Sequence, residues 1–306
     1  MDGVITGFGI IGFVIATGYV AERTGIVGKN ATQVLNRVAY FIANPALLFT
    51  VLARADLRDV FSSAVAVELF AVVAVSGLYV VFNALWFKRG VPDATLGAMA
   101  ASYVNASNIG IPVATYVLGN ATYVAPVLLL QLLVISPLAL TMLDISAHGK
   151  VSVMRILSQP VRNPMIVASA LGTIVSATGA TLPAAVMSPF TLLGGAAIPL
   201  VLLAFGMSLG GSTPLRAQQG RAQILVASAL KSVVMPIVAY VVAQNVFGLD
   251  GRPLFAAVMM AALPTAQNVY NYASRFNKSI TVARDTVFLT TVMAVPALVI
   301  TATLLS

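Results

Sequence analysis

The sequence contains no cysteine, and only 8% of its 306 residues are charged. Without cysteine there is no disulfide framework, no thiol nucleophile and no thiolate-bound metal. The one histidine, His148, cannot complete a metal-ligand cluster or a Ser/His/Asp arrangement, and no phosphate-binding loop or paired aspartate motif is present. We therefore expect a protein that is not an enzyme, with no catalytic residue, no metal and no cofactor.

The scarcity of charge is matched by an excess of apolar residues, which make up 59% of the chain. A soluble domain is about 45–50% apolar and about 25% charged. A helix needs about 20 mostly apolar residues to cross a hydrocarbon core of about 30 Å, so the chain has room for roughly ten crossings. Hydropathy predicts spans at 3–21, 34–53, 61–87, 94–117, 121–143, 163–178, 185–209, 220–247, 253–275 and 280–305.

The net charge of +8 is sorted by side of the membrane, which favours the positive-inside rule over nucleic-acid binding. The loops after odd-numbered spans, with their flanks, hold Arg23, Lys29, Arg37, Lys88, Arg89, Lys150, Arg155, Arg162, Arg216, Arg221, Arg275, Lys278 and Arg284. The opposite side holds Arg54, Arg58 and Arg252. We expect a multi-pass protein of the inner (plasma) membrane with both termini outside.

The two halves of the chain resemble each other. Pro45 and Pro199 interrupt spans 2 and 7, and 105–112 in span 4 corresponds to 264–271 in span 9. Five spans per half is an odd number, so the second half must insert upside down relative to the first. We predict an all-α membrane protein of ten helices in two inverted five-helix repeats, 1–143 and 163–306, joined by a cytoplasmic linker at 144–162.

Spans 4 and 9 each hold prolines and amides about halfway along. Proline removes a backbone donor and breaks a helix, and freed backbone groups at membrane depth must line a polar cavity or be buried in protein. If Pro112 and Pro264 each begin the second half of a broken helix, two helix N-termini favour an anion there. The alternative is a pair of kinks whose amides join helices; the recurrence in both halves favours a binding site. Its expected residues are Asn105, Asn108, Gly110, Pro112, Pro264, Gln267, Asn268 and Asn271.

Glu68 and Lys231 lie inside spans 3 and 8, where ionisable side chains are costly and are functional candidates. Lys231 has three possible roles: pairing with Glu68, carrying a coupling proton, or binding a substrate carboxylate. Snorkelling to the membrane surface is the alternative for both side chains. Two further groups are expected to be structural: Arg37 and Asp285 as interfacial anchors, and Asn83, Gln131 and Gln244 as interhelical hydrogen-bonding residues.

Six motifs in order make the chain similar to the auxin efflux carrier family, which includes the plant PIN-FORMED carriers and many bacterial permeases. They are 44–49 (NPALLF), 105–112 (NASNIGIP), 195–200 (GAAIPL), 230–231 (LK) with Pro236, 263–268 (LPTAQN) and 285–291 (DTVFLTT). The resemblance implies a fold like that of the sodium and bile-acid symporters. Spans 1, 2, 6 and 7 would form a scaffold, and spans 3–5 and 8–10 would move as a transport domain carrying the substrate at the crossover of spans 4 and 9. The long central loop of the plant carriers is absent, as is an acidic sodium ligand.

The leading hypothesis is secondary active transport of a small organic anion by an elevator mechanism, with coupling to H+ or Na+ as an open question. The substrate classes are a dicarboxylate, an auxin-like aromatic acid and an amino-acid-like compound. The expected partners are this anion, the lipid bilayer and a second copy of the chain bound through the scaffold. The alternative is a membrane sensor that binds a solute without transporting it.

Overall fold

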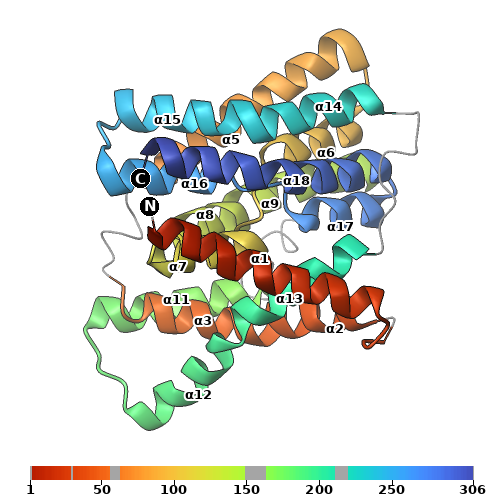
Figure 1. Ribbon diagram of the computed structural model, residues 1–306. Helices are drawn as coiled ribbons and strands as arrows, with labels where there is room; N and C mark the ends of the chain where they lie inside the picture. The colour runs from red at the N-terminus through yellow and green to blue at the C-terminus, as the bar shows by residue number, and fades with distance from the viewer. Residues whose placement is uncertain (1, 29, 56–62, 149–162, 211–219, 306) are drawn as a thin grey trace. The chain divides into compact units, whose positions relative to one another are not determined.

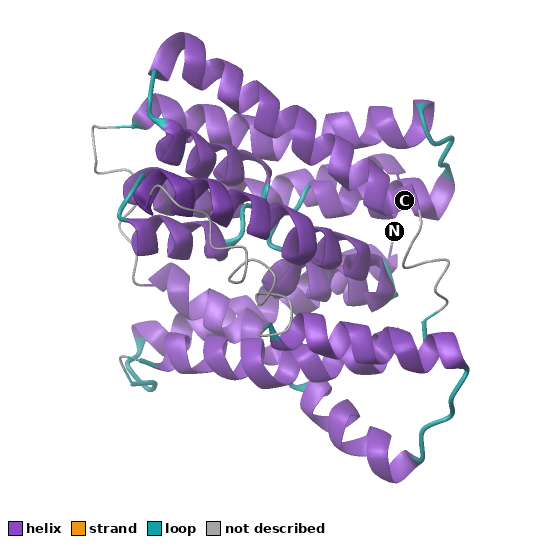
Figure 2. Ribbon diagram, turned by 180° about the vertical axis from the view of Figure 1, so that it is seen from behind, coloured by secondary structure: helices purple, strands orange, loops and turns teal. Residues whose placement is uncertain are grey.

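The computed structural model describes residues 2–28, 30–55, 63–148, 163–210 and 220–305. These residues form helices joined by short loops, with no β-strand and one isolated β-bridge (Figure 2). Of the predicted linker at 144–162, residues 149–162 lie outside the described residues, and the preceding helix continues as far as His148.

Within the described ranges, six helical segments are long and apolar enough to cross a membrane: Ala31–Leu52, Ser63–Phe87, Ala121–Ser146, Ala184–Leu209, Arg221–Asn245 and Ile280–Leu305. Large apolar side chains remain uncovered by protein, such as Phe13 (74% exposed), Leu192 (79%) and Leu304 (75%). A soluble monomer rarely leaves such apolar surface in water, whereas lipid covers it at no cost. The chain is an all-helical, multi-pass membrane protein, as its composition predicts.

The helices fall into two units, each drawn from both halves of the sequence. Unit 1 covers 1–62, 107–129 and 157–212. Its helices are α1 (Asp2–Arg23), α2 (Ala31–Val38), η1 (Ala39–Ala43), α3 (Asn44–Leu52), α7 (Ile111–Tyr116), η4 (Ala121–Val124), α8 (Ala125–Leu130, except its last residue), α11 (Pro164–Thr178), α12 (Ala184–Gly195) and α13 (Ala197–Gly210).

Unit 1 is held together by close helix contacts at glycine. Gly18 of α1 lies against the Leu203 backbone of α13, and Gly206 of α13 lies against the Ile15 carbonyl of α1; a Cβ at either glycine would overlap that oxygen. Gly194 of α12 lies similarly against Leu47 of α3. Small residues let helix backbones approach closely where lipid gives no hydrophobic driving force, and these glycines allow such close packing in unit 1.

Unit 2 covers 63–106, 130–156 and 213–306. Its helices are α5 (Ser63–Phe82), η2 (Asn83–Phe87), α6 (Val91–Ser102), η5 (Gln131–Ile135), α9 (Ser136–His148), α14 (Arg221–Ala229), η6 (Leu230–Val234), α15 (Met235–Asn245), α16 (Gly251–Ala261), α17 (Gln267–Phe276) and α18 (Ile280–Leu305). Helix α5 lies beside α15 and α6, and α16 lies beside α15 and α18 (Figure 1). The Tyr79 ring of α5 fills the space over Gly97 of α6.

A recurrent local feature is a π-helical turn placed just before a proline. The turns η1, η3 (Ala106–Gly110), η5 and η6 end two residues before Pro45, Pro112, Pro137 and Pro236. Proline cannot donate to the carbonyl four residues earlier and clashes with it in a regular α-helix. A wider π-turn relieves that clash and lets the helix continue, and such turns are frequent at functional sites. Three of these four turns hold polar side chains in their own residues: Asn108, Gln131 and Lys231.

Candidate functional site

Two interrupted helices of unit 2 meet through their backbones. Helix α6 ends at Ser102 and α16 ends at Ala261, and an extended segment follows each. Val104 and Thr265 form an antiparallel β-bridge. The Asn105 N–H donates to the Pro264 carbonyl (2.7 Å), and the Ala266 N–H donates to the Tyr103 carbonyl (2.9 Å). Each break thus satisfies backbone groups of the other, as polar backbone at membrane depth requires.

Buried side chains complete the hydrogen bonding of this bridge. The Thr265 hydroxyl donates to the Ala100 carbonyl (2.6 Å), in the last turn of α6. The Thr265 N–H donates to the Thr290 hydroxyl of α18 (3.1 Å), and the Gln131 amide donates to the Val104 carbonyl (3.0 Å). Hydrogen bonds with α6, α18 and η5 therefore stabilise the paired breaks, which are not simple proline kinks.

A hydroxyl cluster lies next to the bridge. The hydroxyls of Tyr103 and Ser136 are 2.8 Å apart, and the Tyr272 hydroxyl of α17 donates to Ser136 at 3.5 Å. Ser136, Tyr272 and Thr290 are neighbours of the breaks that were not among the predicted site residues. The one local signal for Ser136 is its place before Pro137 inside an apolar span.

The predicted residues of the second break lie at the start of α17. Pro264 is buried within the break and does not begin the second half of the helix, contrary to the prediction, because α17 starts at Gln267. Gln267 and Asn268 are half-buried in the first turn of α17, and Asn271 is exposed. The N-cap residue of α17, Ala266, provides no side-chain hydrogen bond to the helix. The first-turn N–H groups, which carry the positive end of the helix dipole, therefore lie beside the half-exposed amides of Gln267 and Asn268.

The predicted residues of the first break are divided between the two units. Asn105 belongs to unit 2 and is 4% exposed. Asn108, Gly110 and Pro112 belong to unit 1, where Asn108 is half-buried and the other two are buried. Pro112 does not begin the second half of the helix, contrary to the prediction, because helical structure resumes at Ala106. The π-turn at Ala106–Gly110 accommodates the proline, so the interruption falls earlier, at 103–105.

Both ionisable residues predicted inside spans are buried in unit 2. Glu68 of α5 is 2% exposed and Lys231 of η6 is 0% exposed, so neither reaches the surface by snorkelling. The Lys231 ammonium donates to the Ala261 carbonyl at the end of α16 (2.7 Å) and contacts the Met235 sulfur (3.2 Å). The Glu68 Oε1 atom has no hydrogen-bond partner.

The structure confirms some of the structural roles predicted for other polar side chains and contradicts others. Gln131 makes the predicted interhelical bond. Asn83 instead bonds the backbone of Arg89, which holds the loop before α6, and Gln244 is exposed. Arg37 is exposed, but Asp285 is 0% exposed and pairs with Arg284 (2.7 Å), so Asp285 is not an interfacial anchor.

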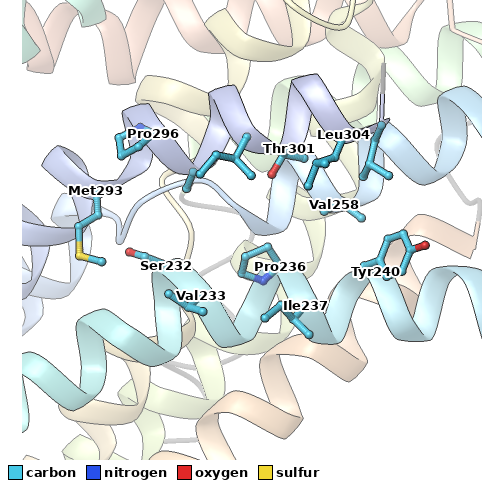
Figure 3. Close-up of a pocket in the computed structure, with 13 residues that line it drawn as sticks. Ser232, Val233, Pro236, Ile237, Tyr240, Val258, Met293, Pro296, Thr301 and Leu304 are labelled. Atoms are coloured by element: carbon cyan, nitrogen blue, oxygen red, sulfur yellow. The ribbon is translucent and has the colours of Figure 1, made fainter.

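A cavity of about 680 Å³ lies elsewhere in unit 2, among η6, α15, α16 and α18 (Figure 3). Ser232, Tyr240 and Thr301 contribute hydroxyl groups, and the rest of the lining is apolar, including Pro236 and Pro296. A site for an organic anion needs placed donors or positive charge. None of the predicted site residues lines this cavity, so we assign the candidate site to the breaks.

Comparison with known proteins decides the family. A family model described as "Membrane transport protein" matches residues 9–302. The chain belongs to this family. The predicted kinship with auxin efflux carriers is thereby confirmed, and the protein belongs to a family of transporters, not enzymes.

Relatives of similar length support this assignment. An uncharacterized transporter of Methanothermobacter thermautotrophicus is 27% identical, over 93% of this chain and 92% of its own length. YfdV, an uncharacterized transporter of Escherichia coli K12, is 25% identical over 86% and 85%. A protein of Rhizobium meliloti described as a candidate malonate transporter is 25% identical over 92% and 89%.

Proposed function

We propose that this protein is a secondary active transporter of a small organic anion, which binds where the helices before Asn105 and Gln267 are interrupted. The observation that carries the proposal is the paired break, in which two extended segments hydrogen-bond to each other beside the uncapped first turn of α17. Interrupted helices of this kind are the usual substrate sites of secondary transporters. No nucleotide-binding motif is present, so an ion gradient or the solute gradient drives transport.

The chemistry of the breaks favours an anion. Neither 103–116 nor 262–277 contains an acidic residue, and both carry amides that donate hydrogen bonds. The N-terminal dipole of α17 adds positive potential, which stabilises a carboxylate. Within this class we propose a small carboxylate, with malonate as the first compound to test because a relative is described as a candidate malonate transporter.

The architecture we propose is ten membrane helices in two inverted five-helix repeats, with spans 4 and 9 as crossover helices and elevator movement of a transport domain. Spans 1, 2, 6 and 7, the proposed scaffold, all contribute to unit 1. Spans 3, 8, 9 and 10 contribute to unit 2, and spans 4 and 5 are divided between the two units. We further propose a homodimer through the scaffold, with insertion in the inner membrane and both termini outside.

Transport by purified protein in liposomes tests the site. We expect Asn108→Ala and Gln267→Ala each to abolish uptake of labelled malonate while leaving expression and monodispersity intact, because each removes an amide donor beside a break. Gln244→Ala is the matched control, since this exposed amide lies on α15 away from both breaks. Near-normal uptake by both site variants would refute the crossover site.

The same liposome assay distinguishes a carrier from a membrane sensor, the alternative function that the sequence also allows. A carrier accumulates the anion against its gradient when a proton or sodium gradient is imposed. A sensor binds organic acids in a thermal-shift screen but leaves the internal concentration unchanged. Binding without accumulation, across the organic acids that stabilise the wild type, would favour the sensor.

A further inference from the structure

Glu68 and Lys231 are a buried acid and a buried base that act on each other and lie outside the proposed substrate site. Glu68 is 2% exposed and Lys231 is 0% exposed. Each acts electrostatically on the other. An ionised carboxylate buried without a hydrogen bond is costly, and the Glu68 Oε1 atom has no donor. A proton on this oxygen, or movement of the Lys231 ammonium towards it, removes that cost.

Lys231 connects this acid to the second break. Its ammonium donates to the carbonyl of Ala261, the last residue of α16, at 2.7 Å. The final carbonyls of a helix lack intrahelical donors and carry the negative end of its dipole, so a cation there is stabilising. Ala261 is three residues before Pro264, whose carbonyl accepts the Asn105 N–H. A movement of the Lys231 ammonium would therefore change the hydrogen bonding at the start of the segment that forms the bridge.

Other ionisable side chains on the neighbouring helices have their own partners or lie at helix ends. Asp93, in the first turn of α6, accepts a hydrogen bond from Ser279, and Asp285 of α18 pairs with Arg284. Tyr79 of α5 lies within electrostatic reach of Asp93 and Arg89. The remaining ones are Arg221 of α14, Tyr240 of α15 and Arg252 of α16, none of which acts on Glu68 as Lys231 does.

We propose that Glu68 is the proton-binding residue of this transporter and that the position of Lys231 links the protonation state of Glu68 to the end of α16. This inference rests on the proposed transport function. In the protonated state, Glu68 Oε1 carries a hydrogen and Lys231 stays on the Ala261 carbonyl. When the O–H bond breaks and the proton leaves to water, the new carboxylate attracts the ammonium. Lys231 then exchanges its bond to Ala261 for one to Glu68, and the carbonyl end of α16 loses its cation.

Proton binding is measured directly by infrared titration of the purified protein. We expect the carboxyl C=O stretch of wild type to contain a component that titrates with pH and is absent in Glu68→Gln, which keeps the shape of a protonated glutamate. Asp250→Asn is the matched control, because Asp250 is exposed and its side chain makes no cap hydrogen bond. If Glu68→Gln does not yield folded protein, Glu68→Asp should keep a titrating component at an altered pH.

Coupling is measured by malonate uptake into liposomes with the membrane potential clamped at zero by potassium and valinomycin. A gradient of one pH unit stores about 1.4 kcal/mol per proton, which supports about tenfold accumulation for one proton per solute. Wild type and Asp250→Asn should show this accumulation. Glu68→Gln should lose it yet retain malonate counterflow.

The two measurements separate the two proposals. Accumulation by Glu68→Gln equal to wild type, or an unchanged titrating carboxyl component in that variant, would overturn the proton site. Absence of any organic-acid transport by wild type, with the Glu68 component present, would overturn the proposed function and leave the proton site standing.

Discussion

The hydrogen bond from Thr265 to Ala100 gives the sharpest test of how the breaks are stabilised. Thr265 and Ala100 are both 0% exposed, and the threonine hydroxyl lies 2.6 Å from the carbonyl oxygen. Ala100 lies in the last turn of α6, where the helix ends before Val104 can donate to its carbonyl. Thr265→Val keeps the shape of the side chain and removes the donor, so the carbonyl becomes a buried, unsatisfied acceptor.

The expected cost follows from that burial. Leaving a buried acceptor without a donor costs about 1–3 kcal/mol. Hydrogen bonds between membrane helices contribute about 0.6 kcal/mol on average and at most about 1.7 kcal/mol, because the lost partner is often replaced by another. Ala100 and Thr265 are both fully buried, so the freed carbonyl does not face bulk solvent. We therefore expect Thr265→Val to lose about 1–2 kcal/mol of stability, near the upper end of the membrane range.

Heating a fluorescent-protein fusion in detergent and following the monodisperse peak by size exclusion measures this loss. Thr303→Val is the matched control, because the Thr303 hydroxyl is exposed and bonds only the carbonyl of Ile300 in its own helix. Thr265→Ser restores the donor and should recover most of the stability. Equal melting of Thr265→Val and Thr303→Val would refute this role of the hydrogen bond, as would a Thr265→Ser variant as unstable as Thr265→Val.

Two further perturbations test other contacts. Gly206→Ala should abolish the monodisperse peak, because its Cβ would overlap the Ile15 carbonyl and separate α13 from α1, whereas Gly12→Ala, with nothing within 4 Å, should behave as wild type. Gln131→Leu should weaken malonate affinity in thermal-shift titration by releasing the Val104 carbonyl beside the bridge; an unchanged midpoint would show that Gln131 does not position the site.

Much of this organisation can be predicted from the sequence because lipid imposes simple rules. Apolar runs of span length and sparse charge indicate membrane helices, and proline with amides in mid-span indicates interrupted ones. Those rules identify the segments around Asn105 and Pro264 without any contact being known. Two of the family motifs, 105–112 and 263–268, lie in the same segments.

The remaining features depend on contacts between distant segments, which no local pattern encodes. Pro112 was expected at the break, but the π-turn at Ala106–Gly110 lets the helix pass through it. Asp285 was expected at the interface, yet it is buried beside Arg284. Thr265, Gln131 and Ser136 acquire their roles from partners 165, 27 and 33 residues away, namely Ala100, Val104 and Tyr103. Periodicity and hydropathy predict which residues enter the membrane, but not which of them meet.

The two breaks share a geometry and differ in chemistry. In each, a carbonyl in the last turn before the break accepts a hydrogen bond from a side chain of another segment. The Ala100 carbonyl accepts from the Thr265 hydroxyl, and the Ala261 carbonyl accepts from the Lys231 ammonium. A hydroxyl is neutral at every physiological pH, whereas an ammonium carries a charge that a neighbouring carboxylate can attract. If Glu68 is the proton-binding residue proposed above, the end of α16 responds to protons through Lys231, while the end of α6 is held by a neutral hydroxyl. Under that proposal, the α6 break holds the bridge, and the α16 break changes with the protonation of Glu68.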